Sequence, residues 1–260
     1  MLGSIQIATI RGIPIRIHLT LFIVVIILVS QLGILGLPAG LLLFGSVLAH
    51  ELGHSIVAQR YGIPIASIDL HLLGGTALMQ GLPRRPRQEL WIALAGPLVS
   101  LSLGLFGAAL VLLLQVRVGI QARTLLDLIP FFAAVNLGMA LFNLIPALPM
   151  DGGRVLRALM AERTDVVTAT KRAARISRVI SVTFVLFGIY IGGWTLSLLG
   201  VVLFSMAGHE VRIAEAQAWR DSEAERTRAF VEYVTARGFS PPWPPPSVRN
   251  SEPSGPVIDV

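Results

Sequence analysis

The feature that most constrains the fold of this chain is a series of long apolar runs. They cover Leu19 to Ser30, Leu37 to Ala49, Leu90 to Leu114, Leu128 to Ile145, and Ile176 to Met206 with an interruption at Gly192-Gly193. With its flanks, each run is near or above the roughly 18 to 20 residues that a membrane helix needs, and the last is long enough for two spans. Only 14% of the residues are charged, against about a quarter in a soluble domain. The sequence therefore predicts an all-α membrane protein with six transmembrane helices.

The basic residues are unevenly divided between the predicted loops. If the amino terminus is cytoplasmic, 19 of the 21 Lys and Arg residues fall on the cytoplasmic side, and only Arg117 and Arg123 fall outside. Cytoplasmic loops carry such an excess, so both termini are predicted to be cytoplasmic. The charge forms no soluble basic patch, so the expected partner is the lipid bilayer and not nucleic acid. Of the basic residues only Lys171 is not arginine, which favours a GC-rich prokaryotic genome and a prokaryotic plasma membrane.

The sequence divides into four predicted segments. Residues 1–17 alternate with period two, as a strand does, and 18–208 form the six-helix core with a β-type insert at 62–82. A charged amphipathic helix on the cytoplasmic side follows at 209–239, and a proline-rich tail at 240–260 is predicted to be disordered. The six helices are expected at 18–35, 41–61, 88–116, 128–144, 176–190 and 194–208, with an outer turn at 36–40 and a further amphipathic helix from Arg154. Irregular backbone at membrane depth is tolerated only where it is buried in protein or lines a wet cavity, so the insert forms a small membrane-associated β-element.

One apolar run contains the sequence A-H-E-L-G-H at positions 49–54. His50 and His54 are four residues apart, so on a helix both imidazoles lie on one face and can reach one ion. Glu51 is rotated by one position and can address a water on that ion. This is the H-E-x-x-H arrangement of zinc hydrolases, and it predicts one Zn²⁺ per chain. The alternative, in which the histidines pack helices and Glu51 is their ion partner, is disfavoured because ionisable clusters within a membrane are usually functional.

A catalytic zinc needs a third protein ligand, with the fourth position left for water. The candidates are Asp69, His71, Asp127, Asp151, His209 and Glu210. The predicted topology places the two histidines in the cytoplasmic half of the second helix. Asp127 then lies at the outer end of the fourth helix, and His209 and Glu210 lie too far toward the cytoplasm. Asp69 and His71, in the β-type insert, are not excluded by depth.

Asp151 lies at a similar depth to the histidines, within N-L-I-P-A-L-P-M-D-G-G at positions 143–153. The prolines and glycines end the fourth helix and turn the carboxylate inward. Asp151 could instead cap the next helix as its N-cap residue. The matching depth of the H-E-x-x-H sequence favours the ligand role.

Together these two motifs resemble the site-2 protease family of intramembrane metalloproteases. The resemblance extends to R-G-I-P-I-R-I-H before the first helix and to L-L-G-G in the insert, and covers about residues 5–210. It implies regulated intramembrane proteolysis, the hydrolysis of a peptide bond within or near a transmembrane segment of a substrate protein. It implies zinc held by His50, His54 and Asp151, with Glu51 as the general base.

The resemblance also assigns residues that contact the substrate. Asn143 is expected to hydrogen-bond the substrate or the developing oxyanion. Gly74 and Gly75 are expected in a β-element that receives the unwound substrate as an added strand, although a plain hairpin turn would also explain them. His71 is either a strand-face histidine or a gating group near the metal.

The chain differs from larger members of this family, because it has no PDZ insertion between helices and no room for paired CBS domains after the last one. A minimal form is therefore expected, with a cytoplasmic regulator and a homo-oligomer left open. Two other functions remain as alternatives. A membrane zinc transporter would show inverted repeats and acidic residues along a path, and neither is visible. A pseudoprotease that binds helices without cutting them is disfavoured by the intact Glu51.

Overall fold

The computed structural model describes residues 4–72, 74–83, 85–115, 124–238 and 258–259. The helices are α1 (Leu21–Leu32), η1 (Gly33–Leu35), α2 (Gly36–Arg60), α3 (Pro86–Leu113), η2 (Leu125–Asp127), α4 (Leu128–Asn143), α5 (Asp151–Ala161), α6 (Val166–Tyr190) and α7 (Trp194–Ala236). The strands are β1 (Ser4–Ile10), β2 (Ile13–His18), β3 (Ile65–His71), β4 (Gly74–Met79) and β5 (Ile258–Asp259). The predicted combination of apolar helices with a small β-element is confirmed.

The helical part has the surface of an integral membrane protein. Within the described residues, five helical stretches are long and apolar enough to cross a membrane: Leu21–Arg60, Pro86–Leu113, Leu125–Asn143, Val166–Tyr190 and Trp194–Ala236. Large apolar side chains point outward from these helices, among them Leu112, Tyr190 and Trp194, which are 78 to 85% exposed. Exposing so much apolar surface to water is unfavourable, whereas contact with apolar lipid tails carries no such cost.

The first of these stretches is bent back on itself. Gly33 has a φ of 58°, which breaks the helix between α1 and α2. The backbone at Gly36 lies against the backbone of Val29. A Cβ placed on Gly40 would lie 3.5 Å from the Val25 side chain. The two helices therefore run antiparallel. The predicted outer turn at 36–40 is wrong in position, because these residues form the start of α2. Pro38 is tolerated there, since the N–H groups of the first turn of a helix have no partner within the helix.

The last two predicted boundaries also differ from the structure. α6 begins at Val166 instead of 176, because Asp165 caps it by accepting a hydrogen bond from the Thr168 backbone N–H at 2.9 Å. The segments predicted separately at 194–208 and 209–239 form one uninterrupted helix, α7. The predicted disordered tail lies outside the described residues except for the short strand β5.

The β-type segments at the two sides of α1 and α2 join in one sheet with the order β1-β2-β3-β4-β5. β1 and β2 form a hairpin, β2 pairs in parallel with β3, and β3 pairs antiparallel with β4. One face of the sheet is apolar and packs on Ala58 of α2 through Ile15, Ile68 and Ala77, all of which are fully buried. This packing places β4 alongside the H-E-x-x-H segment of α2.

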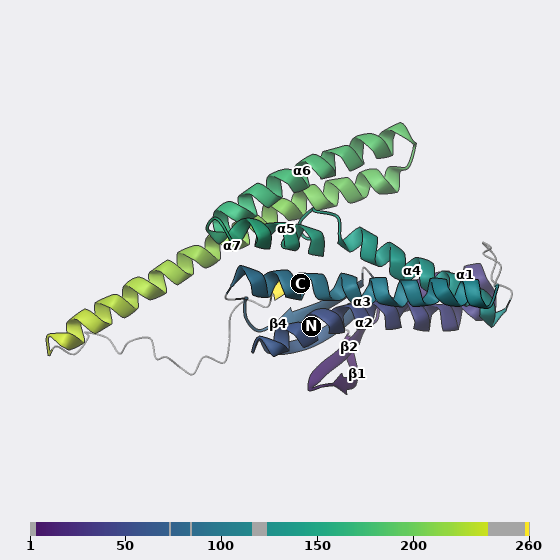
Figure 1. Cartoon of the computed structure of the whole chain (residues 1–260), viewed down its shortest axis with the longest axis horizontal. Coiled ribbons are helices and arrows are strands. Elements are labelled where there is room, and N and C mark those ends of the chain that lie inside the picture. Colours follow the sequence, from purple (N-terminus) through teal and green to yellow (C-terminus); the bar gives the residue numbers. More distant parts are fainter. Residues whose placement is uncertain (1–3, 73, 84, 116–123, 239–257, 260) are drawn as a thin grey trace.

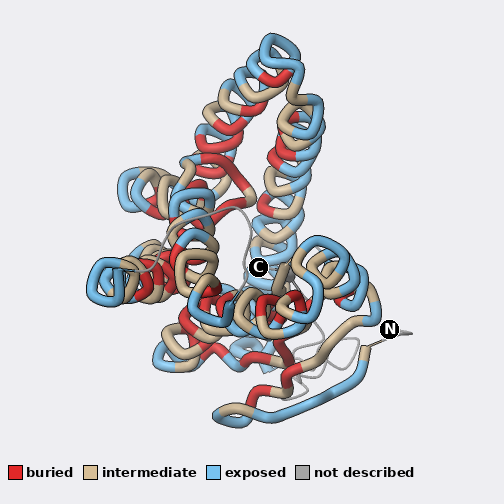
Figure 2. Tube along the Cα trace, turned by 90° about the vertical axis from the view of Figure 1, so that its right-hand side faces the viewer, coloured by how far each residue is buried: buried red, intermediate tan, exposed pale blue. Residues whose placement is uncertain are grey.

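Figure 1 shows α2, α3 and α4 as neighbouring rods above the sheet, and α6 and α7 as a second, paired group with α5 between the two groups. α6 and α7 pack closely through small residues, since a Cβ on Gly200 would meet the Ser181 carbonyl at 2.6 Å. Figure 2 shows buried residues along the facing sides of these two helices and exposed residues on their outer sides. Close contact between small residues is typical of helix packing in membranes.

Candidate metal centre

The two histidines lie buried on the face of α2 that meets α3. Two glycines let these helices approach closely. A Cβ on Gly53 would come within 2.9 Å of the Ala95 carbonyl oxygen, and a Cβ on Gly96 would overlap the imidazoles of both His50 and His54. The two rings therefore fill the space that a side chain at position 96 would need.

The Nδ1 atom of each ring contacts α3. His54 Nδ1 lies 2.6 Å from the carbonyl oxygen of Ile92. A carbonyl oxygen can only accept a hydrogen bond, so Nδ1 must carry the proton. In a neutral ring, Nε2 is then unprotonated and offers a lone pair to a metal. His50 Nδ1 lies 2.9 Å from the hydroxyl of Ser100. Such contacts to the outer nitrogen fix the orientation of metal-ligating histidines.

Asp151 is the first residue of α5, and Gly152 and Gly153 follow it. A Cβ on either glycine would collide with the backbone between Leu144 and Leu148, so only glycine lets α5 start this close to the end of α4. Asp151 makes no N-cap hydrogen bond, and the cap position is taken by Met150. The capping alternative is therefore wrong, and the carboxylate faces the histidines instead.

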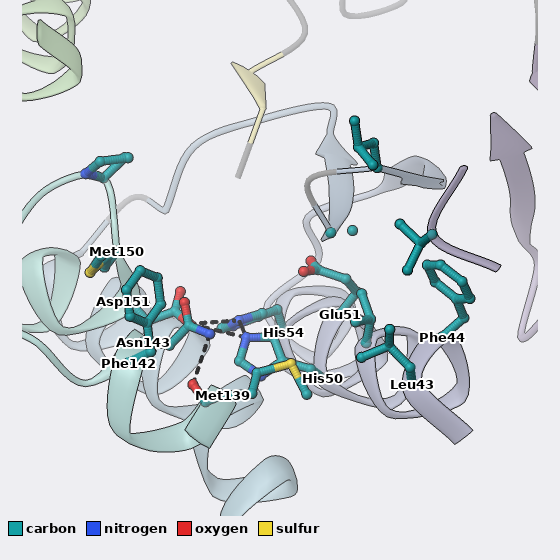
Figure 3. Close-up of a pocket in the computed structure, with 16 residues that line it drawn as sticks. Leu43, Phe44, His50, Glu51, His54, Met139, Phe142, Asn143, Met150 and Asp151 are labelled. Atoms are coloured by element: carbon teal, nitrogen blue, oxygen red, sulfur yellow. Dashed lines mark hydrogen bonds and ion pairs between the residues drawn. The ribbon is translucent and has the colours of Figure 1, made fainter. Parts of the chain in front are cut away.

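The three side chains converge on one point, as Figure 3 shows. Asp151 Oδ2 lies 3.2 Å from His50 Nε2 and 3.3 Å from His54 Nε2, and the two Nε2 atoms are 3.2 Å apart. Ligands about 2.0 Å from a tetrahedral zinc are about 3.3 Å apart. The donor set, its spacing and the lone pair of His54 Nε2 therefore fit a zinc ion. Among the described residues, these three are the group that could hold a metal.

The other five candidates for the third ligand lie elsewhere. Asp127 accepts the backbone N–H of Thr124 at 2.7 Å and caps η2. His71 Nε2 lies 2.9 Å from the Thr76 hydroxyl on the neighbouring strand. Asp69 is on the same strand, with its Oδ1 buried and without a partner. His209 is exposed, and Glu210 binds Arg157.

Glu51 lies in the wall of a pocket of about 410 Å³, which the three converging side chains also line. Its Oε2 is buried and has no hydrogen-bond partner. Gly74 and Gly75 line the same pocket, and a Cβ on Gly75 would lie 2.6 Å from the Glu51 Cγ. β4 thus runs directly beside the glutamate. Both glycines belong to this strand, of which they are the first two residues.

Asn143 also lines the pocket, at the carboxyl end of α4. Its Nδ2 donates to the Met139 carbonyl of its own helix at 3.0 Å. Figure 3 shows the side chain beside Asp151, on the side of the pocket opposite Glu51. The walls of one pocket therefore hold every residue to which the resemblance gives a metal-binding, catalytic or substrate-binding role.

Three features of the site lay outside the sequence prediction: Ser100, the Ile92 carbonyl and Gly96. All belong to α3 and act on the two imidazoles. The available signal was the four-residue spacing of Gly96, Ser100 and Gly104, which places small residues on one face of a membrane helix. That pattern indicates close packing, but it does not identify the helix that packs there.

Comparisons with known proteins agree with this geometry. The family model described as Peptidase family M50 matches residues 38–124 and 117–188. A zinc metalloprotease of Methanocaldococcus jannaschii is 39% identical over 218 residues, which is 82% of this chain and 62% of that protein. A protein of Mycobacterium tuberculosis named putative zinc metalloprotease Rip3 is 37% identical over 194 residues, 71% of this chain and 49% of that protein. The chain thus spans between about half and two thirds of the length of these curated relatives.

A solved structure supports the same relationship. The site-2 protease from Methanocaldococcus jannaschii superposes with a TM-score of 0.59 at 35% identity, and the match covers 80% of this chain and 95% of that one. The family model alone spans more than half of the sequence and includes His50, His54 and Asp151. The chain therefore belongs to peptidase family M50, the family of the site-2 proteases.

Proposed function

We propose that this chain is a zinc metalloendopeptidase that hydrolyses a peptide bond within or near a transmembrane segment of a membrane protein. The observation that carries the proposal is the convergence of His50, His54 and Asp151 beside a buried, unpartnered Glu51. This cluster lies inside a bundle whose outer surface suits lipid. The names of the relatives, zinc metalloproteases and a site-2 protease, favour the same activity.

The side chains of the pocket divide the work of the reaction. When bound, zinc supplies a water with a pKa of about 7 and a positive charge that stabilises the oxyanion. Glu51 Oε2 accepts a proton from the attacking water and returns it to the nitrogen of the leaving amine. Asn143, across the pocket, hydrogen-bonds the substrate carbonyl or the developing oxyanion in this proposal. His50 and His54 are held in orientation by α3 and remain neutral ligands.

The substrate is proposed to bind along β4. A peptide bond in a helix is covered by the helix's own hydrogen bonds, so the substrate must unwind before attack. The edge of β4 can replace those bonds by adding the unwound segment as a strand. β4 pairs with β3 along one edge, and in the described residues its other edge pairs with β5 only at Leu78 and Met79. The edge at Gly74 and Gly75, beside Glu51, is thus available to a substrate.

Gly75→Ala tests the role of β4. The added methyl would press on Glu51, so we expect the kcat for a transmembrane substrate to fall by about 10-fold while zinc content stays at one per chain. Gly81→Ala is the matched control, since a Cβ there meets only Ile63 at an ordinary 3.9 Å. Zinc content and initial cleavage rates of the purified variants give the measurement. Equal rates for the two variants would contradict the close contact between β4 and Glu51 from which the loss is expected.

The membrane arrangement is proposed as six passes with both termini in the cytoplasm of a prokaryote. The antiparallel packing of α1 on α2 supports two passes in the first apolar stretch, and the asymmetry of arginine supports the orientation. The segments 1–17, 18–208, 209–239 and 240–260 are proposed as the functional divisions. Tags at each terminus, tested for protease access in sealed inside-out vesicles, check the orientation.

Removal of the metal tests the proposed activity. We expect a strong chelator to abolish cleavage of a transmembrane substrate in proteoliposomes, and one equivalent of Zn²⁺ per chain to restore it. The melting temperature should fall with the chelator and recover with zinc, since a ligand that binds only the folded state stabilises it. Cleavage that persists in metal-free protein would refute the proposal.

A further inference from the structure

A second buried polar cluster lies outside the pocket and joins three helices. Arg157 of α5 donates from Nε to Glu89 of α3 at 2.7 Å and from Nη1 to Glu210 of α7 at 3.1 Å. The Arg157 side chain is only 14% exposed. Burial alone would lower the pKa of Arg157, but the two carboxylates raise it above its ordinary value. The three side chains therefore form a network of two ion pairs that is largely buried.

Such a cluster is a poor source of stability by itself. Taking three charges out of water is costly, and apolar residues of similar size often stabilise a protein as well as a buried ion pair does. Buried ionic groups can instead fix one arrangement of the surrounding elements. The guanidinium of arginine suits this use, because its rigid fork holds two partners in set directions.

The helices joined by Arg157 are those that build the metal centre. Arg157 follows Asp151 by six residues, about 9 Å along the axis of α5. Glu89 lies about one turn of α3 before Ile92. The carbonyl of Ile92 accepts the hydrogen bond from His54 Nδ1. The contact between Arg157 and Glu89 therefore links the helix that supplies the carboxylate ligand to the helix that orients both imidazoles.

Near its first turn α5 is anchored by Gly152 and Gly153, which pack on the preceding backbone, and further along it by the buried Ala158 and Ala161. A shift or rotation of α5 would carry Asp151 Oδ2 away from the two Nε2 atoms. Ligand distances in metal sites lie within about 0.2 Å of their usual values. The ionic contacts of Arg157, six residues after Asp151, add a restraint of fixed direction on this motion.

We propose that Arg157 is a positioning residue, which through Glu89 and Glu210 holds α5 so that Asp151 closes the metal centre. The inference rests on the proposed zinc protease function. It adds that α7, through Glu210, contributes to the ligand geometry of a site that it does not itself line.

The test compares Arg157→Met with Arg87→Met in the full chain. Arg87 also joins α3 to the end of α5, through Glu162 at 3.0 Å, but its side chain is 82% exposed. For Arg157→Met we expect zinc affinity, measured by competition with a chromogenic chelator, to fall by about 10-fold or more. The visible absorption spectrum of the cobalt-substituted protein should change, and kcat should fall while KM stays within about twofold. Arg87→Met should match the wild type in all of these.

Three further variants separate positioning from general damage. Arg157→Lys keeps the charge but not the fork, so it should recover part of the zinc affinity. Glu89→Gln and Glu210→Gln keep side-chain size and should each cause a smaller change in the same direction. The melting temperature of metal-free protein shows which variants fold. Wild-type zinc affinity and cobalt spectrum in folded Arg157→Met or Glu89→Gln overturn the inference, whereas a wild-type chain that neither binds zinc nor cleaves overturns the proposed function instead.

Discussion

Glu51→Gln is expected to lower the rate of peptide cleavage by about 10³-fold while the protein still binds one zinc per chain. The amide has nearly the shape of the carboxylate but cannot accept a proton from water. Because Glu51 is not among the three converging donors, its replacement leaves the metal ligands intact. The measurement pairs the initial rate on a transmembrane substrate with the zinc content of the same sample.

The same variant separates the proposed protease from the two alternative functions. A zinc transporter or a helix-binding pseudoprotease would retain most of its transport or binding after this substitution. Glu162→Gln is a suitable control, since that residue lies at the surface in a contact with Arg87. Undiminished cleavage by Glu51→Gln would rule out the assigned general base. Comparing membrane-protein fragments in cells that carry the wild type or Glu51→Gln would then reveal the natural substrates.

Gly96→Ala is expected to disrupt the metal centre itself. The new Cβ would overlap both imidazoles, so either the rings must turn or α3 must move away from α2. In both cases the spacing of the three donors is lost, and we expect zinc affinity to fall by about 100-fold, with cleavage lost in parallel. Isothermal titration of metal-free protein with Zn²⁺ measures the effect.

Gly45→Ala provides the control for this experiment. Gly45 lies on α2 five residues before His50, and a Cβ there would meet nothing within 4 Å. Alanine is the better helix former, so the control should fold as well as the wild type. Equal zinc affinity in the two alanine variants would show that the packing of α3 against the histidines does not shape the site.

The candidate ligands could be identified from the sequence because their chemistry has a local signature. His50 and His54 are placed on one face by helical periodicity alone, and the cost of burying them in an apolar run indicates a cation. Asp151 needed a further argument from topology, since it is 97 residues further along the chain than His54. Depth in the membrane supplied that argument, because it orders residues from different helices along one axis.

The supporting contacts could not be predicted, because they depend on which helices meet and at what rotation. Ser100 and the Ile92 carbonyl have no signature until α3 is known to lie against α2. The same holds for Arg157, which in the sequence is one of several arginines after Asp151. Its two partners, Glu89 and Glu210, come from helices far apart in the chain. The position of the first turn was missed for a simpler reason: a proline is compatible both with a loop and with the first turn of a helix.

The continuity of α7 sets the direction in which its carboxy-terminal half faces. The helix runs without a break from Trp194 to Ala236, and each residue turns it by about 100°. Adding or removing one residue after Glu210 would therefore rotate every later side chain by more than a quarter turn relative to the catalytic core. Removing seven would restore the facing to within about 20° while shortening the helix by about 10 Å. The direction in which any surface on that segment faces therefore depends on the number of residues between it and Glu210, where Arg157 binds the helix.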